Sequence, residues 1–450
     1  MSDINVLQRT ESTKGRRIIF GAPRLGTSLV LGIEGFAVFT LYLTGYLLDP
    51  FLIGIALAMG YLSIAAGQFL LGWISDAKYT KLGRRKPYLI IFGPLLGISF
   101  IFLLLPALVL PDMSDKTSLF FWLLIWDVIF RFCYAVTTPY QAWMAEVFPA
   151  SERPEVSQVQ NTFNFIGNGL MALTTLLVFT GVFDKVAANP DVIPIEFLLI
   201  VVTFGLIAII LFIFIVVFMP TESNYEINSS LWENLKNTVK NKNFMKVVLM
   251  QGISGFGWSI ISTVMLTYVE VVLGLDGNDY LIVAVLFLLS IFGFLYFWRK
   301  RIEKSGKKQT LLLIFVIAII FLPITLLGLI AAIPSLILGL VFIIGVGLVL
   351  GGWYLFPYII YADLAEDDEK ATGDLKAGIY SGFPSIILNI FQAIGVFILG
   401  IIVGLPSITI GINTFSIGLV IWGPLVSLIL IISYVYTKKF VELDFKWERD

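Results

Sequence analysis

The sequence predicts an all-α polytopic membrane protein with twelve transmembrane helices in two six-helix halves. Its 450 residues are 58% hydrophobic and 14% charged, with a mean hydropathy of +0.93. A soluble chain does not carry this much apolar surface, because its outer faces must meet water. About twelve apolar segments reach the roughly 20 residues that a helix needs to cross a bilayer. They are centred near residues 38, 63, 98, 130, 172, 207, 260, 288, 320, 348, 390 and 426. Their continuous, non-alternating character excludes a closed β-barrel.

The first 25 residues are polar and basic, and they lack the apolar core of a cleavable signal peptide. We therefore expect a cytoplasmic tail at this end of the chain. In a twelve-span topology only Lys116 and Lys185 fall in outer loops, whereas nearly all other basic residues fall in inner loops or tails. Because basic loops stay on the cytoplasmic side, the protein is predicted to lie in the cell membrane with both termini inside.

The loop after the second span carries a compact motif, in which Gly72-Trp73-Ile74-Ser75-Asp76 precedes Gly83-Arg84-Arg85-Lys86-Pro87. Proline suits the first turn of a helix, where its missing N–H costs nothing. The glycines permit a tight turn. We expect salt bridges here with an acidic run at 366–369, and an ordinary solvated loop is the alternative. The predicted cytoplasmic gate consists of Asp76, Gly83, Arg84, Arg85 and Asp363.

Four charged residues fall at membrane depth, where an unpaired charge costs several kcal/mol. Asp127 and Arg131 are four residues apart, so they share a helix face and can pair. Glu34 lies in the first span, and Glu270 is expected at the outer interface. An intramembrane charge is a functional hypothesis by default, although Asp127 and Arg131 could also form a static pair.

Glu34, Asp127 and Arg131 are our candidates for proton coupling. A buried carboxyl group resists ionisation, while a nearby guanidinium favours it. Protonation of either acid would free Arg131, change the local packing and let one helical bundle reorient. Substrate binding that favours the protonated state would then couple the two fluxes.

Sugar recognition requires amides and carboxylates for the hydroxyl groups and aromatic faces for the C–H side of the ring. Several such side chains fall at plausible depth, and three asparagines on the fifth span recur at i, i+3 and i+7, which makes a polar stripe. Hydrogen bonds between helices are the alternative explanation of that stripe. The candidate substrate-binding residues are Glu34, Gln141, Asn161, Asn164, Asn168, Gln251, Trp258, Tyr354, Asn389 and Gln392.

The longest polar stretch inside the chain, at about 221–243, separates six spans from six. The predicted units are a tail at 1–25, a bundle at 26–220, a cytoplasmic central loop at 221–245, a second bundle at 246–437 and a tail at 438–450. The halves echo one another, which suggests a duplicated six-helix unit. Pro139-Tyr140 with Ala145-Glu146 matches Pro357-Tyr358 with Ala362-Asp363, and Gly83-Arg84-Arg85 matches Gly306-Lys307-Lys308.

These motifs resemble one branch of the major facilitator superfamily, the glycoside–pentoside–hexuronide:cation symporters. Six residues separate Asp76 from Gly83, as in that branch, and the resemblance runs from about residue 25 to 435. The other matching motifs are Gly32-Ile33-Glu34-Gly35, Pro139-Tyr140 through Pro149 and Arg153, and Pro357-Tyr358 through Tyr380. The resemblance implies a twelve-helix secondary transporter of the major facilitator fold that moves a sugar together with a cation.

The chain departs from this family at the positions that imply a sodium site. The two aspartates that sodium-dependent members carry in the second span fall on Ile64 and Gln68, and the aspartate of the fourth span falls on Thr137. The arginine of the fifth span and the lysine of the eleventh fall on Asn161 and Asn389. Because a hard cation needs several oxygen ligands, these losses favour H⁺ over Na⁺ as the coupling ion.

The most consistent interpretation is a proton-coupled symporter for a sugar or glycoside that works by alternating access. Rivals are a sodium-coupled symporter, a transporter of lysolipids or other amphipathic cargo, a non-transporting sensor and a membrane-embedded transferase. A chain without histidine and without a phosphate-binding loop argues against an enzyme and against ATP-driven transport. We expect no cofactor or metal, no nucleic-acid partner, contact with membrane lipids and a monomeric state. The lone Cys133 excludes an intramolecular disulfide.

Overall fold

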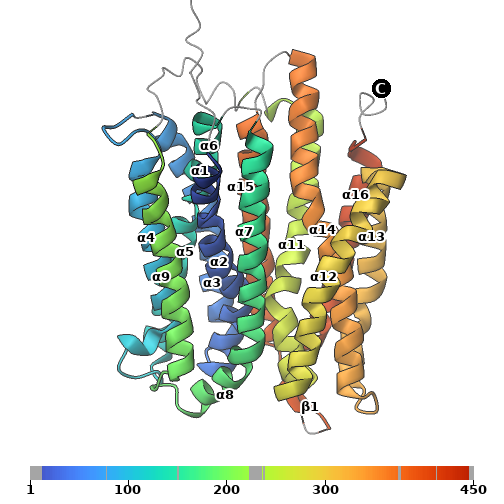
Figure 1. Ribbon diagram of the computed structural model, residues 1–450. Helices are drawn as coiled ribbons and strands as arrows, with labels where there is room; N and C mark the ends of the chain where they lie inside the picture. The colour runs from blue at the N-terminus through green and yellow to red at the C-terminus, as the bar shows by residue number, and fades with distance from the viewer. Residues whose placement is uncertain are drawn as a thin grey trace, which may run out of the picture.

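The computed structural model describes residues 13–77, 79–148, 152–221, 236, 239–372, 377–411 and 413–444. The protein is a bundle of long helices that lie side by side, and a small β-hairpin lies at one end of the bundle (Figure 1). We call the end that carries the hairpin the hairpin face. The opposite end, where α1 and the end of α16 lie, is the terminal face (Figure 1).

The first half of the chain is helical throughout its ordered elements. Their bounds are α1 Lys14–Gly21, α2 Pro23–Thr40, η1 Leu41–Gly45, α3 Pro50–Ala77, α4 Lys86–Leu104, η2 Pro106–Leu108, α5 Lys116–Tyr134, α6 Thr137–Val147, α7 Arg153–Thr174, η3 Thr175–Phe179, α8 Thr180–Ala188 and α9 Ile195–Phe218. The predicted central loop lies largely outside the described residues, so its boundaries stay a prediction.

The second half repeats this organisation and adds the hairpin. Its elements are α11 Lys242–Thr267, η4 Tyr268–Val272, α12 Gly277–Ser305, α13 Lys307–Phe321, η5 Leu322–Leu329, α14 Ser335–Thr372, α15 Ala377–Val403, β1 Ser407–Ile410, β2 Asn413–Ser416 and α16 Gly418–Phe440. The two strands are antiparallel, and Ser407 pairs with Ser416.

Eleven helical stretches in the described part of the chain are long and apolar enough to cross a membrane. The segment formed by α7, η3 and α8 also runs between the two faces of the bundle (Figure 1). It is less apolar because Asn161, Asn164 and Asn168 lie on α7. Six traversing segments therefore precede the central loop and six follow it, which confirms the predicted fold class.

Corresponding loops of the two halves each contain a glycine with a positive φ. Gly83 has φ +94° and Gly306 has φ +83°, values that favour glycine over other residues. Gly83 closes a tight turn in which Thr80 and Gly83 exchange backbone hydrogen bonds of 3.1 and 2.9 Å. Helix α4 starts three residues later, and α13 starts directly after Gly306. The repeat seen in the sequence thus marks two equivalent helix starts.

The halves are joined chiefly where α3 packs on α15 and α2 packs on α11. Toward the hairpin face, a side chain at Gly54 would come within 2.9 Å of the Cα atom of Gly400, so the two backbones cross closely. Near the same face the hydroxyl groups of Thr40 and Thr267 are 2.9 Å apart. These residues are the last of α2 and α11, which makes the contact another sign of the repeat.

Candidate functional site

The centre of the first half holds a buried ion pair between α2 and α5. The Nη2 and Nε atoms of Arg131 donate to Oε1 of Glu34 at 2.5 and 3.1 Å. Only 3% of Arg131 and 2% of Glu34 is exposed. Both residues lie near the middle of their membrane-spanning stretches, Lys14–Gly45 and Lys116–Met144. The folded bundle therefore brings together two charges that are 97 residues apart in the chain.

A second carboxyl group completes this cluster. Oδ2 of Asp127 is 3.6 Å from Nε of Arg131, one helical turn away on α5, and Asp127 is fully buried. Glu34 and Asp127 are therefore both partners of the same guanidinium. Two ionised carboxylates can only accept hydrogen bonds. In the described part of the chain no donor reaches Oε2 of Glu34 or either oxygen of Asp127. We call Glu34, Asp127 and Arg131 the charge cluster.

Helix α3 forms the third wall of the charge cluster. The guanidinium carbon of Arg131 is 3.7 Å from the ring centroid of Tyr61. At the preceding residue, Gly60, an added Cβ would overlap Oδ2 of Asp127 and come within 2.7 Å of Cδ of Arg131. Neither residue was predicted from the sequence. A glycine inside a helix is a weak sign of close packing, but nothing in the sequence singles out Tyr61.

The charge count sets the chemistry of the cluster. Two carboxyl groups share one guanidinium, so the cluster carries a net negative charge when all three groups are ionised and is neutral with one added proton. A net charge buried in the hydrocarbon region is costly. A proton on either carboxyl group removes this charge. The cluster is therefore electrically neutral only when one proton is bound.

The predicted substrate-binding residues lie in several places around the bundle. On α7, Asn164 accepts a hydrogen bond from Oγ of Ser28, Asn168 is half-buried and Asn161 is exposed. Between the halves, Nδ2 of Asn389 is 3.4 Å from Oε1 of Gln68. Gln141 and Gln392 are half-buried, on α6 and α15.

The second half contributes a polar and aromatic set on α11 and α14. Gln251 is fully buried, and no hydrogen-bond partner reaches its amide within the described residues. Two turns along α11, the ring of Trp258 stacks on that of Trp353 at 5.3 Å. The next residue of α14, Tyr354, is 41% exposed. Trp353 was not among the predicted residues.

The gate residues form ion pairs within each half. Nη2 of Arg85 is 2.5 Å from Oε1 of Glu146, and its Nη1 donates to Oγ of Ser75 at 2.7 Å. In the second half, Nζ of Lys307 is 2.6 Å from Oδ2 of Asp363. Arg84 is buried next to Gly83, and the side chain of Asp76 is outside the described ones. These two ion pairs occupy matching places in the repeat. In both pairs a helix start packs on the end of a helix in its own half. The predicted bridges to the run at 366–369 stay a prediction.

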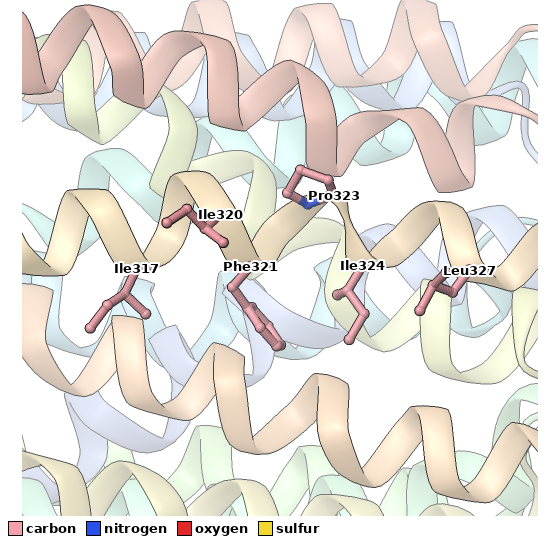
Figure 2. A pocket seen from close by; sticks show the side chains of 6 residues that line it. All are labelled: Ile317, Ile320, Phe321, Pro323, Ile324 and Leu327. Carbon is pink, nitrogen blue, oxygen red and sulfur yellow. The ribbon is translucent and has the colours of Figure 1, made fainter.

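Two other features lie away from the charge cluster. Glu270 is in η4, at the hairpin-face end of its span, as expected for an interfacial residue. An open apolar pocket of about 550 Å³ lies along α13 and η5 (Figure 2). Its lining is Ile317, Ile320, Phe321, Pro323, Ile324 and Leu327. This lining offers no polar side chain to a sugar, so the pocket does not fit the predicted substrate.

Comparison with known proteins defines the class. The sequence profile of the MFS/sugar transport protein family matches residues 19–437. The chain therefore belongs to this family of the major facilitator superfamily, and it is a multi-pass membrane transporter rather than an enzyme. A search of curated protein sequences finds no match.

Solved structures share the fold at low sequence identity. The nucleoside transporter NupG is 14% identical with a TM-score of 0.63, and the match covers 94% of this chain and 98% of NupG. A D-xylose–proton symporter is 13% identical with a TM-score of 0.62, covering 95% and 96%. A bacterial homologue of the human lysosomal transporter Spinster is 11% identical with a TM-score of 0.61, covering 94% of both chains. At these identities the likeness shows the fold alone.

Proposed function

We propose that this transporter is a proton-coupled symporter of a sugar or glycoside, from the glycoside–pentoside–hexuronide branch. The observation that carries the proposal is the charge cluster, in which two carboxyl groups and one guanidinium are buried near the middle of their spans. Charged groups at this depth are costly and mark coupling sites in membrane transporters. A static pair would need only one acid for Arg131, whereas this site holds two.

The cluster gives proton uptake a structural consequence. With one proton bound it is neutral and can stay buried between α2, α3 and α5. Loss of the proton leaves a net negative charge, which favours access to water over burial. Because α2 contacts α11 and α3 contacts α15 in the other half, a change in the packing of α2 and α3 also changes the interface between the halves. A substrate that prefers one arrangement of the halves is then coupled to the proton.

The cluster also supports H⁺ over Na⁺ as the coupling ion. Sodium needs several oxygen ligands with net negative charge around it. Here the guanidinium of Arg131 already pairs with both carboxyl groups, so a second cation would be repelled. Ile64 and Gln68 replace the family's acidic ligands on α3. A proton needs only one free carboxyl group and is compatible with the arginine.

The substrate class is supported by buried polar and aromatic side chains on α11, α14 and α15. Gln251 and Asn389 offer amides, and the stacked pair of Trp258 and Trp353 offers aromatic faces. This combination suits a ring that has hydroxyl groups on its edge and C–H groups on its faces. The family profile, which describes sugar transport, agrees with this assignment.

The test is a proton-flux assay with the purified protein in sealed vesicles. Mono- and disaccharides are added with and without sodium while a dye reports external pH. We expect one or a few sugars to cause sodium-independent alkalinisation, and the Glu34→Gln variant to lose it while keeping sugar exchange. The lipid-facing variant Phe69→Leu serves as the control, since 45% of Phe69 is exposed. Proton movement that persists in Glu34→Gln contradicts the role of Glu34. No response to any sugar, with thermal stabilisation by lysolipids, favours amphipathic cargo instead.

We further propose that the terminal face is cytoplasmic and that the protein works as a monomer in the cell membrane. The positive residues gathered at this face support the orientation. Labelling of single cysteines in intact cells tests it, because the native Cys133 is buried. A cysteine placed at Thr409 in the hairpin should react with an impermeant reagent, and one at Lys439 should not. The opposite pattern would reverse the orientation.

A further inference from the structure

The contact between Tyr61 and Arg131 is fixed by the packing of α3 on α5. The hydroxyl of Ser63 donates to the backbone carbonyl of Val128 on α5 at 2.8 Å. One helical turn further, a side chain at Gly67 would come within 2.9 Å of Cβ of Ala135. Together with Gly60, these contacts fix the distance and rotation of α3 against α5. They therefore place the Tyr61 ring on the guanidinium.

Tyr61 differs from the other partners of Arg131 in its response to a proton. Glu34 and Asp127 attract the guanidinium only while they are ionised. The aromatic face attracts a cation through its quadrupole, and this attraction is strongest where water is excluded. The cation–π interaction of Tyr61 with Arg131 therefore persists when a carboxyl group becomes neutral.

We propose that Tyr61 is the positioning residue that keeps the Arg131 guanidinium in the charge cluster while the proton comes and goes. This proposal rests on the proton coupling proposed above. Without the ring, the cation depends wholly on the two carboxylates, so neutralising one of them becomes less favourable. The protonated state then requires a higher proton concentration. Removal of the ring should move the pH midpoint of transport to lower pH.

The test is the pH profile of sugar uptake by the full-length protein in vesicles. Tyr61→Phe keeps the ring, whereas Tyr61→Leu and Tyr61→Met remove it. We expect the midpoint of Tyr61→Phe to match that of the wild type, and the other two to shift by about one unit toward acid. Phe69→Leu removes a ring from a lipid-exposed site on the same helix and should leave the midpoint unchanged.

The outcomes separate this proposal from the one on which it rests. If the wild type moves protons but Tyr61→Leu or Tyr61→Met keeps the wild-type midpoint, Tyr61 has no positioning role. A purely structural role would lower the amount of folded protein and leave the midpoint in place. Two variants without the ring are used so that the test remains possible if one of them misfolds. If the wild type shows no sugar-driven proton movement, both proposals fall.

Discussion

The charge cluster makes a quantitative prediction about stability. Arg131→Ala leaves Glu34 and Asp127 buried without a cation, and the three residues are at most 3% exposed. Removal of one partner from a buried ion pair typically costs about 3–5 kcal/mol. Glu34→Gln should cost less, about 1.5–3 kcal/mol, because Arg131 keeps Asp127 at 3.6 Å and loses only its charge-assisted hydrogen bonds.

A neutral version of the cluster separates charge from packing. Replacing a buried ion pair with uncharged groups of similar volume is often neutral or stabilising. The triple variant Glu34→Gln, Asp127→Asn, Arg131→Met should therefore recover most of the stability that Arg131→Ala loses. It should still show no sugar-driven proton movement, because no titratable group remains in the cluster.

The assay is equilibrium denaturation in mixed detergent micelles, followed by tryptophan fluorescence, with proton flux measured on the same preparations. Stability of Arg131→Ala equal to that of the wild type would refute the reasoning, since it would mean that water reaches the two carboxylates. Proton movement by the triple variant would place the coupling site elsewhere.

Three further predictions concern the surroundings of the cluster. Gly60→Ala should destabilise the protein by about 1–3 kcal/mol and abolish proton movement, because its Cβ would overlap the cluster. Gly293→Ala should leave stability unchanged or raise it by up to about 1 kcal/mol, because its Cβ meets nothing within 4 Å and alanine favours a helix over glycine. A double-mutant cycle on Gln68 and Asn389 should give a coupling energy of about 0.6 kcal/mol, the average for hydrogen bonds between membrane helices, and a value of zero would remove this contact between the halves. Cys133 should resist thiol reagents in the folded protein and react after unfolding, which mass spectrometry can follow; rapid labelling of the folded protein would contradict its burial.

The sequence by itself determined the class and the inventory of unusual residues. Hydropathy is a local property of the chain, so the spans could be located without a structure. Glu34, Asp127 and Arg131 could also be identified from the sequence, because a charged residue inside an apolar segment is rare and easily recognised. The spacing of Asp127 and Arg131 also fixed their shared helix face. The matching glycines at 83 and 306 helped to reveal the repeat, because a position with a positive φ strongly favours glycine.

Only the tertiary structure decided which of these residues meet. The rotation and register of one helix against another come from side-chain packing along the whole contact, which no short window of sequence contains. The ion pair of Glu34 with Arg131 depends on how the bundle positions α2 and α5, and the place of Tyr61 depends on the packing of α3 on α5. For the same reason Arg85 meets Glu146 in its own half. The chain specified the charges, and the packing of the helices specified their partners.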